Sequence, residues 1–186
     1  MADAVPGPWL TRANALTGLR LATALPLACA IAAGQAGLAA ALFAAAVASD
    51  LLDGRVARRF GESSALGGLL DHGADATTVV CGLAALAWQG AVPAALPPLI
   101  ALAFAQYALD SRALAGRRLR ASALGRANGI AYFALLGTPL VRDALGLAFP
   151  GPALVRGVGW VLVATTLLSA ADRAAAFRTR RLGPGV

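Results

Sequence analysis

The residues best suited to chemistry are four aspartates within one short segment of an otherwise apolar chain: Asp50, Asp53, Asp71 and Asp75. Carboxylate oxygens are the ligands that hard divalent cations such as Mg²⁺ and Mn²⁺ prefer. Two such ions could share four aspartates and still keep coordination positions for phosphate oxygens. The alternative is a structural charge network with the neighbouring arginines, Arg55, Arg58 and Arg59.

Small residues and one arginine are interleaved with these aspartates: Gly54, Ala57, Arg58 and Gly67. Glycine lets a flat base or a pyrophosphate approach the backbone, and the small side chain of Ala57 also leaves room for such a ligand. Arg58 could bind a phosphate. Small residues alone are more typical of close helix packing, and an arginine at a helix end often serves only as an interfacial anchor. Their position among the aspartates favours a nucleotide-binding wall.

Helical spacing predicts how these residues are brought together. Asp50, Asp53, Gly54 and Ala57 recur three or four residues apart, so they share one face of a helix. Gly67, Asp71 and Asp75 share a face of the next helix for the same reason. The short intervening segment lets the two helices lie antiparallel with these faces opposed. We therefore expect the four carboxylates to converge on one pocket.

The composition indicates a single membrane domain of all-α class over residues 1–186. The chain is 59% hydrophobic and only 13% charged, too apolar for an ordinary soluble domain. Apolar stretches recur near the roughly 20 residues that a helix needs to cross a membrane. Residues 1–16 are expected to form an interfacial lead-in and residues 175–186 a cytoplasmic tail. Six membrane-spanning helices are predicted, over residues 17–33, 38–57, 66–89, 92–110, 125–141 and 154–171.

The basic residues are all arginine, and their distribution predicts the orientation. Of sixteen arginines, all but Arg142 and Arg156 fall in alternate segments beside the apolar stretches or at their ends. By the positive-inside rule, both termini and the aspartates are cytoplasmic in a bacterial-type cell membrane. The formal charge of +7 therefore reflects topology and attraction to anionic lipids, not a nucleic-acid partner.

Written as a pattern, the segment reads DxxDGxxAR, eight residues, then GxxxDxxxD, from Asp50 to Asp75. It resembles the signature of the CDP-alcohol phosphotransferase family, integral-membrane enzymes that make phospholipids. The resemblance implies that Asp50, Asp53 and Asp71 bind metal, with Asp75 completing the site and acting as general base. It also implies that CDP lies against the glycine-lined wall and that the protein is a homodimer.

A second resemblance lies upstream, where Asn14, Thr17 and Arg20 match the NxxTxxR pattern that commonly opens the family's first membrane helix. Helix capping or interfacial anchoring also explains this triplet. Further along, an arginine-rich segment could bind an acceptor's phosphate through Arg117, Arg118 and Arg126. Positive-inside topology explains these arginines as well.

The remaining polar and aromatic residues carry weaker signals. His72 follows Asp71 directly, so it turns away from the carboxylates and is interpreted as a neighbour, not a ligand. Tyr107 and Tyr132 are expected to serve packing or the membrane interface. No nucleophilic triad, zinc cluster or P-loop is present in the sequence, so a covalent mechanism has no candidate.

The expected function is transfer of a phosphatidyl group from CDP-diacylglycerol to the hydroxyl of a small polar alcohol, such as glycerol 3-phosphate or inositol phosphate, with release of CMP. A CDP-aminoalcohol phosphotransferase acting on diacylglycerol is the nearest alternative. A divalent-cation transporter is a distant one, because it would need polar residues across the whole bilayer.

Overall fold

The computed structural model describes the backbone of residues 12–60, 65–110 and 123–182, and the side chains of residues 17–52, 67–109 and 123–174. Within these ranges the chain forms six helices and no strand, as predicted. The helices are α1 Arg12–Ala32, α2 Ala36–Phe60, α3 Ala65–Trp88, α4 Leu96–Asp110, α5 Ala123–Ala144 and α6 Pro152–Leu182.

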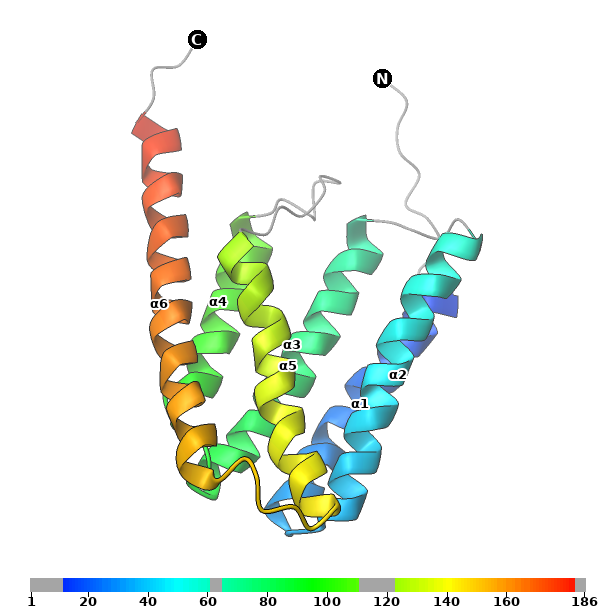
Figure 1. The fold of residues 1–186 in the computed structure, drawn as a ribbon. Helices are drawn as coiled ribbons and strands as arrows, with labels where there is room; N and C mark the ends of the chain where they lie inside the picture. The colour runs from blue at the N-terminus through cyan, green and yellow to red at the C-terminus, as the bar shows by residue number, and fades with distance from the viewer. Residues whose placement is uncertain (1–11, 61–64, 111–122, 183–186) are drawn as a thin grey trace.

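Successive helices run in opposite directions (Figure 1). The starts of α1, α3 and α5 therefore lie at the same end of the bundle as the last turns of α2, α4 and α6. Helix α1 packs on α2 and α3, while α3 also packs on α4. Helix α6 contacts α4 and α5, and α5 contacts α2. Side chains from the end of α2 and the start of α3 are thus brought to one end of the bundle.

The turn after α1 is closed by a glycine in the left-handed conformation. Gly34 has a φ of 68°, which residues with a side chain rarely adopt. Its amide donates to the carbonyl of Ile31, and the amide of Gln35 donates to the carbonyl of Ala30, both at 2.9 Å. These bonds satisfy carbonyls at the helix end and allow α2 to begin at Ala36.

Three helix boundaries differ by four or more residues from those predicted. Helix α1 begins at Arg12, so residues 12–16 of the expected interfacial lead-in are helical. Helix α4 begins at Leu96 instead of residue 92. Pro97 and Pro98 fall in its first turn, where a missing amide hydrogen costs nothing. Helix α6 continues to Leu182, although its apolar stretch ends near residue 171. Residues 175–182 of the predicted tail are therefore helical, because a helix does not need apolar residues to continue.

The helices pack through an apolar core and close backbone contacts. Leu27, Leu83 and Leu136 are almost completely buried within it. At the far end from the aspartates, α6 lies so close to the segment before α4 that a Cβ on Gly159 would be 2.5 Å from Cδ of Pro93. Only glycine fits at that position without movement of one of the two segments.

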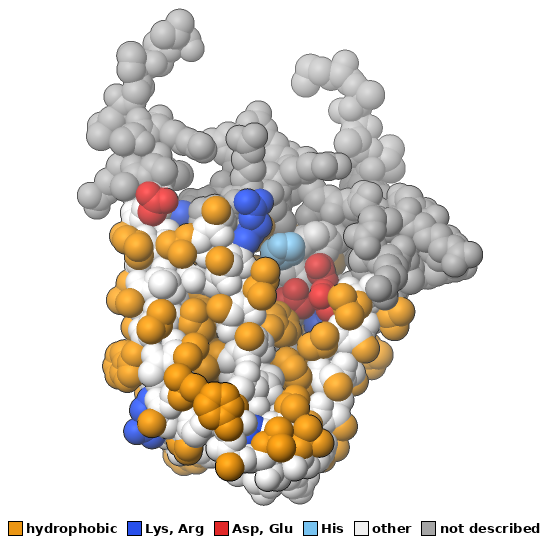
Figure 2. All heavy atoms as spheres, viewed as in Figure 1, with side chains coloured by type: hydrophobic (Ala, Val, Ile, Leu, Met, Phe, Trp, Pro, Cys, Tyr) orange, Lys and Arg blue, Asp and Glu red, His pale blue; other side chains and the backbone are white. Residues whose placement is uncertain are grey.

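Apolar side chains also cover much of the outer surface (Figure 2). Among the described residues, one segment, Pro152–Ala174, is both long and apolar enough to cross a membrane. Three shorter helical segments are also apolar: Thr17–Ala32, Ala36–Leu52 and Leu96–Leu109. All six predicted membrane spans are thus helices, and one of these helices contains a segment that is long and apolar enough to cross a membrane.

Candidate active site

Three of the four aspartates converge where α2 nears its end and α3 begins. Asp50, Asp71 and Asp75 each offer a carboxylate oxygen, and these oxygens lie within 4.8 Å of one another. Their side chains are 40%, 31% and 26% exposed, respectively. Figure 2 shows acidic side chains gathered in a hollow near this end of the bundle. The predicted convergence is confirmed for these three residues, which we call the acid cluster.

The other residues of the predicted metal and nucleotide site are placed only in part. Gly67 lies in the first turn of α3, one turn before Asp71. The side chains of four residues on the last turns of α2 lie outside the described set: Asp53, Gly54, Ala57 and Arg58. Helical backbone continues through all four, so their spacing along α2 is the predicted one.

Arg20 lies within the acid cluster and is almost completely buried. Its Nη1 donates to Oδ1 of Asp71 at 2.8 Å and to Oδ1 of Asp75 at 2.7 Å. Its Nη2 lies 3.4 Å from Oδ1 of Asp50. Its Nε donates to Oγ of Ser49 at 3.3 Å. The NxxTxxR resemblance pointed to this arginine, but capping and anchoring did not predict that it would contact the aspartates.

The donor set of the acid cluster fits a divalent cation. All of its ligand atoms are carboxylate oxygens, which suit Mg²⁺ or Mn²⁺ better than softer metals. Three carboxylates and one guanidinium leave a formal charge of −2 among the described side chains. A single divalent ion would neutralise that charge. The three carboxylate oxygens also lie within 4.8 Å of one another, which is close enough for them to share one ion.

His72 lies beside the acid cluster and does not turn away from it as the sequence predicts. Its Nδ1 is 3.9 Å from Oδ2 of Asp71, which is beyond hydrogen-bond distance. Its ring stacks on that of Tyr107 of α4, with centroids 5.9 Å apart and an interplanar angle of 22°. His72 therefore links α3 to α4 beside the cluster.

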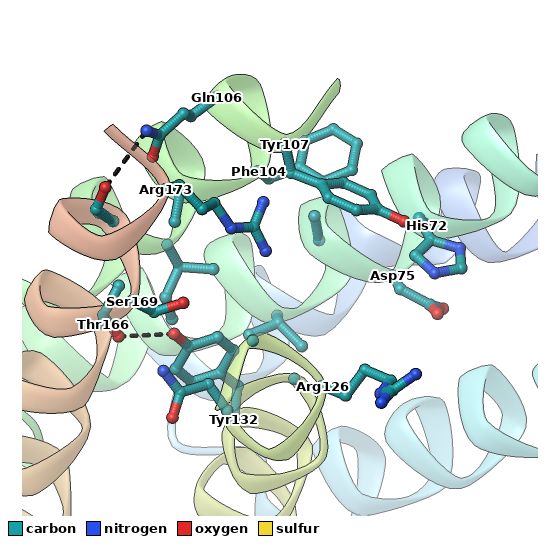
Figure 3. Close-up of a pocket in the computed structure, with 18 of the residues that line it drawn as sticks. His72, Asp75, Phe104, Gln106, Tyr107, Arg126, Tyr132, Thr166, Ser169 and Arg173 are labelled. Carbon is teal, nitrogen blue, oxygen red and sulfur yellow. Dashed lines mark hydrogen bonds between the residues drawn. The ribbon is translucent and has the colours of Figure 1, made fainter. Parts of the chain in front are cut away.

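A cavity of about 180 Å³ adjoins the acid cluster between α3, α4, α5 and α6 (Figure 3). Asp75 belongs both to the cluster and to the wall of this cavity. Apolar atoms make up most of the wall, and Val79, Ile100 and Phe133 are among the residues that contribute them. Polar side chains line the rest: Gln106, Tyr107, Asn128, Tyr132, Thr166 and Ser169. The cavity thus offers a small compartment with polar groups beside a carboxylate.

Two arginines line the same cavity, Arg126 from α5 and Arg173 from α6. The guanidinium of Arg173 extends toward Tyr107, with its carbon 5.1 Å from the ring centroid (Figure 3). Among the described side chains, neither arginine forms an ion pair with a carboxylate. Arg126 was predicted to contact an acceptor, whereas Arg117 and Arg118 lie outside the described residues.

Arg173 and the two tyrosines were not predicted to line a site. The sequence did contain one signal for Arg173. Thr166, Ser169 and Arg173 recur at helical spacing along an otherwise apolar stretch of α6, so they form a polar stripe on one face of the helix. Tyr132 shares a buried hydrogen bond of 2.6 Å with Thr166, so its hydroxyl serves packing between α5 and α6 as well as the cavity wall.

The family model for CDP-alcohol phosphatidyltransferase matches residues 10–170. That range includes all three residues of the acid cluster, Arg20 and most of the cavity wall. No curated protein matches the chain significantly. Because the matched range covers most of its length, the chain belongs to the CDP-alcohol phosphatidyltransferase family, transferases of phospholipid biosynthesis that take a phosphatidyl group from a CDP-alcohol.

Proposed function

We propose that the protein transfers a phosphatidyl group from CDP-diacylglycerol to the hydroxyl of a small phosphorylated alcohol, with release of CMP. The observation that carries this proposal is the position of Asp75, which borders both the acid cluster and the cavity. A donor phosphate held at the cluster and an acceptor held in the cavity would meet at that carboxylate.

The donor side of the site consists of the motif residues. Asp50, Asp53, Asp71 and Asp75 would hold two Mg²⁺ or Mn²⁺ ions, which would neutralise charge on the pyrophosphate. CDP would lie against the wall formed by Gly54, Ala57, Arg58 and Gly67. The described carboxylates support this assignment through their mutual approach to within 4.8 Å.

Asp75 would act as the general base. Its carboxylate takes the proton from the acceptor hydroxyl, and the acceptor oxygen then forms a bond to the phosphorus that bears the lipid. The bond from that phosphorus to the oxygen bridging to CMP breaks, and CMP leaves with the bonding electrons. The described part of the cavity wall holds no cysteine, and this single displacement requires no covalent protein intermediate.

The two cavity arginines favour an acceptor with a phosphate group. Arg126 and Arg173 are cations without a carboxylate partner among the described side chains, and guanidinium groups bind phosphate through charge-assisted hydrogen bonds. A neutral alcohol would leave both charges uncompensated. Arg117 and Arg118 of the preceding segment are proposed to contribute to the same acceptor site.

We further propose that all six helices cross the membrane, with the acid cluster and both termini cytoplasmic, and that the protein is a homodimer. The exposed apolar side chains on most helices support membrane placement. The alternative of a cation transporter is disfavoured, because most of the residues that are buried in the described part of the chain are apolar and offer few ligands along a path.

The proposal is tested by measuring CMP release from purified protein in lipid–detergent micelles with Mg²⁺. CDP-diacylglycerol plus glycerol 3-phosphate or inositol phosphate should release CMP, and unphosphorylated glycerol or inositol should release at least tenfold less. Release from CDP-choline or CDP-ethanolamine with diacylglycerol, and none from CDP-diacylglycerol, would instead establish the aminoalcohol phosphotransferase.

A further inference from the structure

Arg20 has an unusual position for a charged side chain. It is the only charged residue in the described part of α1, residues 17–32, and its side chain is fully buried. Its guanidinium contacts α2 through Ser49 and Asp50, and α3 through Asp71 and Asp75. A single cation from the first helix thus contacts every carboxylate of the acid cluster.

The contacts use carboxylate oxygens that a metal ion could also use. One nitrogen, Nη1, is shared between Oδ1 of Asp71 and Oδ1 of Asp75, at 2.8 and 2.7 Å. A magnesium ion would take carboxylate oxygens at roughly 2.1 Å. An ion that used those two oxygens would compete with Nη1 for their lone pairs. An ion that used the other oxygens would still lie within a few ångströms of a positive charge.

We propose that Arg20 is a built-in counter-cation of the acid cluster, and that its contacts and the binding of a divalent cation weaken each other. The inference rests on the proposed metal centre and assigns a role in that centre to Arg20. Arg20 offsets the repulsion among the carboxylates and positions them, at the cost of lower affinity for the ion. Such coupling is reciprocal, so a bound ion loosens the contacts of Arg20.

The proposal predicts the direction in which loss of Arg20 changes the affinity for a divalent ion. Replacing Arg20 by a neutral residue would remove a positive charge from the neighbourhood of the ion. For charges about 5 Å apart, even water-like screening makes this worth on the order of tenfold in affinity. The variant should therefore bind a divalent ion more tightly than the wild type. It should also be less stable without metal, because three carboxylates then repel one another without compensation.

The experiment uses the full-length protein in detergent at pH 8 and Mn²⁺ alone as the probe. Manganese binding is measured by electron paramagnetic resonance, and the melting temperature is measured in EDTA and in saturating Mn²⁺. Arg20→Gln should bind Mn²⁺ about tenfold more tightly and show a larger difference between its two melting temperatures. Arg156→Gln is the matched control, because Arg156 donates to the carbonyl of Gly90 at the other end of the bundle. Its manganese affinity should equal that of the wild type.

Arg20→Lys covers the case in which the glutamine variant does not fold. Lysine keeps the charge but lacks the planar guanidinium that contacts Ser49 and three carboxylates. The lysine variant should therefore bind Mn²⁺ more tightly than the wild type, by less than the roughly tenfold expected of Arg20→Gln. Equal or weaker manganese binding in these variants would overturn the role of Arg20 alone. A wild-type protein that binds no Mn²⁺ would overturn the proposed metal centre, and this inference with it.

Discussion

The guanidinium carbon of Arg173 lies 5.1 Å from the centroid of the Tyr107 ring. The contact joins the last turns of α4 to α6, and it holds the cation at the wall of the cavity that adjoins Asp75. Stacking on an aromatic ring orients a guanidinium while leaving its edge available to hydrogen-bond an anion. This arrangement is suited to a phosphate on the acceptor.

We predict that Arg173→Gln raises the KM for a phosphorylated acceptor by about tenfold or more, since it removes a charged hydrogen bond to that phosphate. The KM for CDP-diacylglycerol should not change. Initial rates of CMP release with each substrate varied in turn measure both constants, and Arg156→Gln serves as the control. A rise in the KM for CDP-diacylglycerol alone would assign Arg173 to the donor.

Asp75→Asn should abolish transfer while the protein stays in the membrane. Loss of a general base lowers kcat by roughly 10²- to 10⁴-fold. Turnover is measured as CMP release, and the amount of protein in the membrane fraction is measured in parallel. Asp143→Asn is a suitable control, because Asp143 pairs with Arg142 at the far end of α5 and should leave turnover unchanged. Normal turnover in the Asp75 variant would exclude it as the base.

The acid cluster could be predicted from the sequence because its geometry is mostly local. Helical spacing places Asp71 and Asp75 on one face, and a short connection to α2 opposes that face to Asp50. The boundaries of α1, α4 and α6 were predicted less accurately. Apolar content locates a stretch that can be buried, but prolines and helix propensity decide where a helix begins and ends.

The cavity could not be predicted in the same way, because it depends on how α4, α5 and α6 are rotated against each other. Tyr107, Arg126 and Arg173 come from three helices that are far from Asp75 in sequence. Arg20 is a similar case. The NxxTxxR pattern includes Arg20, but the packing of α1 against both α2 and α3 determines which residues it contacts.

The hydrogen bond between Tyr132 and Thr166 predicts a measurable loss of stability. The Thr166 hydroxyl donates to the carbonyl of Leu162, so the Tyr132 hydroxyl is the donor in the 2.6 Å bond between the two side chains. Tyr132→Phe should lower the free energy of unfolding by about 0.5–1.5 kcal/mol. Tyr132→Phe combined with Thr166→Val should cost less than the sum of the two single substitutions. Additive losses would indicate that the two hydroxyls are not coupled.

Two glycines of α6 give a paired test of the packing at the far end of the bundle. A Cβ on Gly159 would lie 2.5 Å from Cδ and 3.2 Å from Cγ of Pro93, whereas a Cβ on Gly157 would meet nothing within 4 Å. Alanine in place of Gly157 should raise the free energy of unfolding by about 0.5–1 kcal/mol, because glycine is a poor helix former. Alanine in place of Gly159 should instead lower it by about 1–3 kcal/mol, because the proline ring cannot rotate away. Reversible unfolding in mixed micelles measures both values, and equal effects of the two substitutions would show that α6 does not pack closely on Pro93.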